Sequence, residues 1–477
     1  MPADELLALR SRRGRVTLAT VILGSGIAIL DGSVVNIALR TIGTDLDADL
    51  ADLQWVLNGY LLSLASLILV GGALGDRLGR RRMYLTGVAG FAVTSGLCAF
   101  AQTPMQLIVF RVLQGVAAAL LTPGSLAIIE SGFRREDRPA AIGAWAGISG
   151  VASAIGPLVG GFLLEHGGWR WIFAINVPLC VLVLVLGRQV PESSDEGEEA
   201  SRFDYGGAVV GVLALGVLTY GLTFWRGWST VAIIGCGVAV LVLVAAFVML
   251  ERRPGAMAPV ALFASRVFTA ANLMTFLVYG ALGAVIFLLV LQLQVTSGYS
   301  PLGAGLAALP LTISMLLFSS RAAAIADRTG PRVPMTVGPI LCAAGVVLLA
   351  FIGSDASYVV HVLPGMLLFA VGLTTLVSPL TAAVLQAAPD RHAGVASGIN
   401  NAVARAGSLL AVAALPAVVG LSGEDYRNPV ALTDGFRTGQ LLCAALLTAG
   451  GIVSWYGLRP DTSADQAPET DSVTGGE

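Results

Sequence analysis

The sequence of 477 residues is 56% hydrophobic and 12% charged, and its mean hydropathy is +0.81. Soluble domains carry about 25% charged residues, so this composition excludes a soluble protein. The formal net charge is −2 and all 28 basic residues are arginine. These features exclude a basic nucleic-acid surface, a lysine-dependent phosphate loop and a lysine general base.

Apolar runs of about 20 residues, the length that crosses a bilayer, recur along the whole chain. They begin near Val16, Trp55, Tyr84, Met105, Ala140, Trp171, Tyr205, Val231, Phe268, Gly303, Val333, Tyr358, Gly394 and Arg437. We therefore expect an all-α polytopic membrane protein with about fourteen transmembrane helices.

Two short acidic segments divide this series of spans. Residues 191–204 are predicted to form a solvated cytoplasmic linker, and residues 461–477 a disordered cytoplasmic tail. We expect an N-terminal six-helix bundle in residues 1–190, two extra spans in residues 205–253 and a C-terminal six-helix bundle in residues 254–460.

The distribution of arginine predicts the orientation in the membrane, because basic residues beside short loops are retained on the cytoplasmic side. With the N-terminus inside, most arginines fall at the cytoplasmic ends of the predicted spans, beginning with the groups at 10–15 and 80–82. Both termini are therefore predicted to be cytoplasmic, in the plasma membrane of a bacterial cell.

The loop after the second span reads GGALGDRLGRRR. Its glycines permit a tight turn and close helix approach, and its aspartate can pair with a guanidinium or cap a helix. The pattern resembles the signature loop between helices 2 and 3 of the major facilitator superfamily. The residues that carry it are Gly72, Gly75, Asp76, Arg77, Gly79 and Arg80.

A second motif places a charge inside an apolar run. The segment LIVFRVLQGVAAA carries Arg111, with Gln114 one helical turn later. A charged side chain within a span is costly and marks a functional site by default. The segment resembles the fourth-helix motif that is typical of proton-coupled members of the superfamily.

The fifth span contains the run GVASAIGPLVGG, with Gly156, Pro157, Gly160 and Gly161. Proline removes a helical hydrogen-bond donor, and the glycines let a neighbouring backbone approach closely. Small-residue packing alone would also produce such a run. It nevertheless resembles the antiporter motif of exporters in this superfamily, and this resemblance favours export over uptake by symport.

Three further segments, LDGSVVNIAL, WVLNGYLL and WRWIFAINVP, are similar to the drug:proton antiporter family with fourteen spans. That family implies two six-helix bundles, two extra central helices, alternating access and proton-driven export. Two departures are Arg40, where the family usually has proline, and the reduced second loop ADRTGPR at 326–332, which Arg321 precedes.

Proton coupling requires a group that changes charge in a low-dielectric site. Asp31 is the one carboxylate that the predicted spans place deep in the membrane. Counting along the helices puts Asp31 and Arg111 in the outer half of the bilayer, where they can meet. We expect Asp31 to exchange between a proton and Arg111 or substrate, with Gln114 and Asn36 completing the polar cluster. A static salt bridge is the alternative.

Further polar and aromatic residues within spans are candidates for the substrate cavity. They are Asn58, Tyr60, Asn272, Tyr279, Asn400, Asn401 and Arg405. In the family that the chain resembles, members with several intramembrane acids suit multiply charged cations. The resemblance therefore implies that this chain, with a single such acid, exports neutral or monovalent lipophilic compounds, such as drugs and antibiotics.

The expected partners are a small lipophilic substrate, protons and membrane lipid, with a monomer favoured. No enzyme activity, cofactor or metal site is expected, because no catalytic constellation recurs and the five cysteines lie singly in apolar segments. Two alternatives stay open. One is a dedicated exporter of a single metabolite, and the other is a non-transporting membrane receptor or sensor.

Overall fold

The computed structural model describes residues 6–194, 204–253, 260–389 and 393–458. Most of the predicted linker at 191–204 and the whole predicted tail at 461–477 lie outside these residues. The regular secondary structure of the described chain is helical, apart from an isolated bridge between Leu7 and Phe133.

The first half of the chain forms seven helices: α1 (Arg12–Asp45), α2 (Leu50–Leu78), α3 (Arg80–Ala99), α4 (Pro104–Gly132), α5 (Arg138–Gly167), α6 (Arg170–Ala174) and α7 (Asn176–Gly187). The helices α8 (Tyr205–Phe224) and α9 (Thr230–Glu251) follow. The second half contains α10 (Arg266–Leu291), α11 (Pro301–Leu306), α12 (Leu309–Thr329), α13 (Arg332–Leu349), α14 (Leu363–Gln386), α15 (Ala393–Val418) and α16 (Pro429–Gly457).

Twelve helical segments of the described chain are long and apolar enough to cross a membrane. Helices α3 and α5, of 20 and 30 residues, pack beside them. The predicted span near Trp171 is divided, since α6 and α7 are separate helices. The all-helical membrane fold is thus confirmed, whereas a total of fourteen spans stays a prediction.

Local sequence signals explain where several helices begin. Ser11, Asp49 and Thr103 each accept a hydrogen bond from a backbone amide in the first turn of α1, α2 and α4. Gly79, with φ +105°, separates α2 from α3, because a residue with a side chain rarely adopts this conformation.

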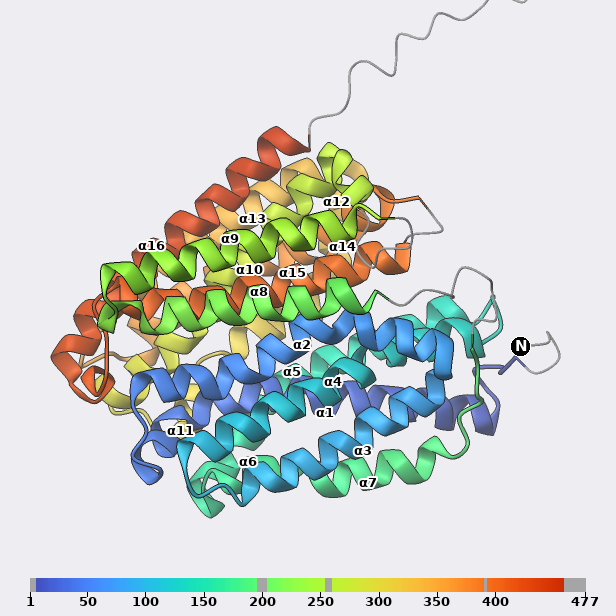
Figure 1. Ribbon diagram of the computed structural model, residues 1–477, viewed down its shortest axis with the longest axis horizontal. Coiled ribbons are helices and arrows are strands. Elements are labelled where there is room, and N and C mark those ends of the chain that lie inside the picture. The colour runs from blue at the N-terminus through green and yellow to red at the C-terminus, as the bar shows by residue number, and fades with distance from the viewer. Residues whose placement is uncertain (1–5, 195–203, 254–259, 390–392, 459–477) are drawn as a thin grey trace, which may run out of the picture.

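The two halves repeat the same packing. In the first half α2 packs along α4 and α1 along α5, and in the second half α12 packs along α14 and α10 along α15. Helix α8 (green in Figure 1) lies beside α2 and α15, where the two halves meet, and α9 packs on α8. The exposed apolar side chains of α9, such as Val231 and Leu241, suit contact with lipid tails.

Hydrogen bonds join the two halves at one end of the bundle. We call the end at which α1 begins the near side, and the end at which α1 finishes the far side. On the far side Leu50 N donates to Gly423 O at 2.9 Å, and Gln54 Nε2 donates to Val412 O at 2.6 Å. The Tyr426 hydroxyl donates to Ala48 O at 2.8 Å. The structure is therefore closed on the far side.

Arg40, the first departure from the family pattern, takes part in this closure. Its guanidinium donates to the carbonyl of Gln294, while Gln294 Nε2 donates to Ile37 O at 2.8 Å. Gln294 lies in a π-helical turn, Gln292–Thr296, that continues α10. In a regular helix this carbonyl would accept a backbone hydrogen bond within the helix, whereas the altered backbone of a π-helical turn leaves it accessible to Arg40.

Candidate functional site: a buried ion pair within the N-terminal half

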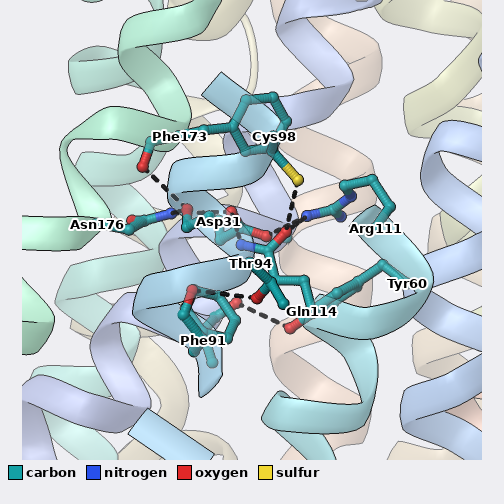
Figure 2. Close-up of polar contacts among 12 residues, drawn as sticks. Asp31, Tyr60, Phe91, Thr94, Cys98, Arg111, Gln114, Phe173 and Asn176 are labelled. Carbon is teal, nitrogen blue, oxygen red and sulfur yellow. Dashed lines mark hydrogen bonds and ion pairs between the residues drawn. The ribbon is translucent and has the colours of Figure 1, made fainter. Parts of the chain in front are cut away.

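Asp31 of α1 lies at the centre of a polar network that is sealed within the N-terminal half (Figure 2). Its carboxylate accepts hydrogen bonds from Arg111 Nη1 at 2.6 Å, Gln114 Nε2 at 3.1 Å and Asn176 Nδ2 at 3.0 Å. Three donors therefore satisfy the oxygens of this buried carboxylate. The side chains of Asp31 and Arg111 are each 1% exposed.

The guanidinium of Arg111 is held on several sides. Its Nε donates to Val56 O of α2 at 3.1 Å, and its Nη1 also donates to Gln114 Oε1 at 2.7 Å. The centre of the Tyr60 ring lies 4.3 Å from the guanidinium, and that of the Phe173 ring lies 5.7 Å away. These contacts fix the position of a charge that would otherwise be costly in hydrocarbon.

Asn176, the first residue of α7, was not among the predicted site residues. Its amide nitrogen bridges Asp31 Oδ1 and the hydroxyl of Ser95 on α3, each at 3.0 Å. The Asn176 Oδ1 atom is buried without a hydrogen-bond partner within the described chain. The family-like segment WRWIFAINVP contains this residue, but its spacing alone gave no reason to place it beside Asp31.

Asn36 does not join the network as we expected. It lies five residues after Asp31, and its amide donates at 3.5 Å to Gly32 O of its own helix. In a helix, a residue five positions along points to a different face, which explains the correction.

Helix α1 is longer than the sequence suggested, because it continues to Asp45. Asp31 therefore lies about 21 Å from the far end of α1, at 1.5 Å per residue, and close to the middle of the helix. We expected a position in the outer half of the bilayer. The ion pair is thus deeper than predicted, although the prediction that its two members meet agrees with the observed contact.

A second group of predicted residues lies where the two halves face each other. Arg405 of α15 is half-buried, and its Nε donates to Asn401 Oδ1 at 3.0 Å. Arg405 also interacts electrostatically with Tyr60 of α2 and Tyr279 of α10. Within the described chain it forms no ion pair with a carboxylate, so its charge is available to a ligand.

Asn58 of α2 is fully buried, and neither atom of its amide has a hydrogen-bond partner within the described chain. It lies one helical turn after Gln54, whose amide contacts α15, and so it points toward the same helix. A buried amide without partners is rare in native structures. Asn58 is therefore a strong candidate for contact with a ligand.

The predicted residues Asn400 and Asn272 form a separate network. Asn400 Nδ2 donates to Asn272 Oδ1 at 3.2 Å and to the hydroxyl of Thr275 at 2.8 Å. Asn272 in turn donates to Phe268 O of its own helix at 2.9 Å. This network joins α10 to α15 within the C-terminal half.

The signature loop forms the junction of α2 and α3. Asp76 Oδ1 and the guanidinium of Arg80 lie 2.7 Å apart across Gly79. Glu192, at the start of the predicted linker, accepts hydrogen bonds from the backbone amides of Arg81 at 3.0 Å and Arg82 at 3.2 Å. The carboxylate thus caps the N-terminus of α3. This capping role was not predicted for Glu192.

In the same junction Gly72 faces α4, Gly75 accepts the Gly79 amide at 3.1 Å, and Arg77 is exposed. Gly72 allows a close but ordinary contact, since a side-chain carbon there would lie 3.7 Å from Pro123. The loop therefore couples the near-side ends of α2, α3 and α4.

The glycines around Pro157 let α5 pack closely on α1 of its own half and on α11 of the opposite half. A side-chain carbon at Gly156 would lie 2.3 Å from Ser33 Oγ, and one at Gly160 would lie 2.6 Å from Val34. On the opposite side, a carbon at Gly161 would lie 2.5 Å from the Cα of Leu302 in α11. The run thus packs α5 on α1 and also forms part of the contact between halves.

Two similar helical halves, joined at one end of the bundle and carrying a buried ion pair, form the arrangement of a membrane transporter. The chain belongs to the Major Facilitator Superfamily, whose family model matches residues 21–204 and 200–412.

Several bacterial relatives share about a third of the sequence. The tetracenomycin C resistance and export protein of Streptomyces glaucescens is 35% identical over 410 residues, which cover 84% of this chain and 76% of that protein. The methylenomycin A resistance protein of Bacillus subtilis is 34% identical over 425 residues, which cover 87% of this chain and 90% of that protein.

Solved structures of transporters show the same fold at low sequence identity. A POT family transporter in complex with 5-aminolevulinic acid has a TM-score of 0.72 and 14% identity, covering 96% of this chain and 100% of that one. The peptide transporter POT in complex with sulfate has a TM-score of 0.70 and 16% identity, and the match covers 96% of this chain and 99% of that one.

Proposed function

We propose that the protein is a proton-coupled antiporter with fourteen spans, which exports small lipophilic compounds across a bacterial plasma membrane. The Asp31 network carries this proposal, since it places one titratable carboxylate and one permanent cation together in a dry site. Resistance and export relatives support the direction of transport and a drug or antibiotic as substrate.

The network provides a means to couple proton uptake to a change of structure. The ionised carboxylate of Asp31 holds Arg111, Gln114 and Asn176 together across α1, α4 and α7. A proton on Asp31 removes the charge that attracts Arg111, and so weakens the link between these helices. Arg111 would then keep its bond to Gln114 and its contacts with Val56 O and Tyr60, which belong to α2 at the interface between halves.

Tyr60 connects the protonation of Asp31 to the proposed substrate site. It stacks against Arg111 and also interacts electrostatically with Arg405 of the opposite half. In our proposal Asn58, Tyr60, Tyr279, Asn401 and Arg405 contact the substrate between the halves. A neutral or monovalent compound suits this site, because the one deep carboxylate already has a cationic partner.

Alternating access requires that the far-side contacts open and re-form. With both termini in the cytoplasm, as we propose, the structure is closed toward the outside. The glycine contact of α5 with α11 and the bonds of Arg40 and Tyr426 would have to break when the protein releases its substrate outward.

The proposal is tested with the full chain reconstituted in vesicles that contain a pH-sensitive dye. Tetracenomycin C and puromycin, which the names of two relatives mention, are added across a preset proton gradient. Antiport predicts that either compound causes proton movement opposite to its own. Compound movement that leaves the internal pH unchanged would refute proton coupling.

A further inference from the structure

Arg321 is a cation within a span, and the proposed transport mechanism gives this side chain no role. It lies on α12 eight residues before the helix ends at Thr329, about 12 Å along the axis. The side chain is exposed, and within the described chain it contacts the ring of Phe318 at 5.5 Å. Within those residues it forms no ion pair, although charged groups in spans are ordinarily paired.

Arg321 lines a groove of about 330 Å³ between α12 and α14. Apolar side chains, including Phe318, Ile325 and Val371, form most of its walls. Its hydroxyl groups are already used, since Thr374 donates to Ser314 Oγ at 3.0 Å and Thr375 donates to Val371 O at 2.8 Å. Arg321 is therefore the polar group that the groove offers to a ligand.

The groove opens on the surface that faces lipid. Ile313 and Leu317 precede Arg321 at intervals of four residues on α12, and both are exposed. Leu367 and Val371 repeat this spacing on α14 and are also exposed. Rows of exposed apolar side chains on adjoining helices are what spans present to acyl chains.

The near-side membrane surface lies a short distance from Arg321. Arg332 stacks on the ring of Trp455 at 3.8 Å, an arrangement typical of the aromatic belt at the interface. Since α13 begins with Arg332 just after α12 ends, Arg321 is about two turns inside this belt. A long arginine side chain can extend toward headgroups from such a depth.

We propose that this groove binds one anionic glycerophospholipid from the near-side leaflet. Its phosphate accepts hydrogen bonds from the Arg321 guanidinium, and one acyl chain lies along Phe318, Ile325 and Val371. The charges are complementary, and the same molecule supplies both the anion and the apolar chain that the groove requires. A free inorganic anion would have to leave water for hydrocarbon to reach this position.

Native mass spectrometry of the purified full chain tests the proposal directly. The protein is mixed with dioleoylphosphatidylglycerol or, in parallel, dioleoylphosphatidylcholine, and retained lipid is counted. We expect Arg321→Gln to lower retention of the anionic lipid about tenfold, the effect of one charge-assisted hydrogen bond. The matched control Arg328→Gln removes an exposed arginine from the end of the same helix and should leave retention unchanged.

A second variant tests the acyl chain separately from the charge. Thr375→Trp fills the groove but keeps Arg321, and we expect it to reduce retention as well. Each variant is first checked for a monodisperse peak, so that loss of folded protein is recognised. Equal retention by wild type and Arg321→Gln, or release of the lipid by inorganic phosphate, would overturn the proposal. None of these results depends on transport.

Discussion

Asp31 and Arg111 lie 80 residues apart in sequence, yet their charged groups meet at 2.6 Å with almost no exposure to solvent. The contact ties α1 to α4, and through Val56 O it reaches α2. In our proposal this pair contributes both to folding and to function. Single and double variants of the pair, measured for both stability and transport, separate the two contributions.

Removing one member of the pair should destabilise the protein more than removing both. Arg111→Met leaves the Asp31 carboxylate buried, and losing one partner of a buried pair typically costs about 3–5 kcal/mol. The double variant Asp31→Asn with Arg111→Met removes the uncompensated charge as well. Thermal unfolding should show the double variant to be more stable than the single one, while neither transports. Equal stability of the two would contradict this account of the pair.

Replacing Asn58 should raise stability and abolish transport. Its amide is buried without a partner within the described chain, and such a group costs about 1–3 kcal/mol. Asn58→Leu removes that cost but also removes the proposed substrate contact. We expect a higher melting temperature together with loss of compound-dependent flux.

Gln54→Leu is the matched control for Asn58, one turn earlier on the same face of α2. Gln54 Nε2 has acceptors in Val412 O and Ala413 O, so its replacement should lower the melting temperature. Retained transport by Asn58→Leu would remove Asn58 from the proposed substrate site.

The sequence predicted the spans because an apolar run of about 20 residues matches the thickness of a bilayer, and it predicted the ion pair because a charge in hydrocarbon needs a partner. Asn176 could not be placed in this way. Amides in spans carry no charge that demands a partner, and its position depends on the break between α6 and α7. Glu192 caps α3 from 111 residues away, a contact that no local pattern specifies.

A side chain at Gly161 should hold the far side open. Its first carbon would lie 2.5 Å from the Leu302 backbone, and overpacking of this kind costs about 1–3 kcal/mol. Gly161→Leu should therefore lengthen the distance between spin labels at Gln102 and Asp355, exposed far-side positions in opposite halves. Gly143→Leu on the same helix, where an added carbon meets nothing within 4 Å, should leave the distance unchanged. No difference between the two variants would argue against a gate at Gly161.

The contribution of Tyr426 to far-side closure should not depend on pH below about 9, because burial raises the pKa of Tyr426 above its ordinary value near 10. The protonated phenol donates to Ala48 O, and a raised pKa means that this contribution is lost only as the pH rises through the higher value. The difference in closure between wild type and Tyr426→Phe, read with the same spin labels, should be constant from pH 5 to about 9. Tyr426→Phe should weaken closure equally throughout. Opening of the wild type but not of Tyr426→Phe near pH 9 would contradict this assignment.

The central claim is that Asp31 carries the coupled proton, and Asp31→Asn in dye-loaded vesicles tests it most directly. Asp45→Asn is the matched control, since Asp45 lies on the same helix and pairs with Arg170 at 2.6 Å, but with both side chains more than 40% exposed. The account predicts that Asp31→Asn reaches normal abundance and loses compound-dependent proton movement, whereas Asp45→Asn keeps it. Proton movement that survives in folded Asp31→Asn would contradict the claim.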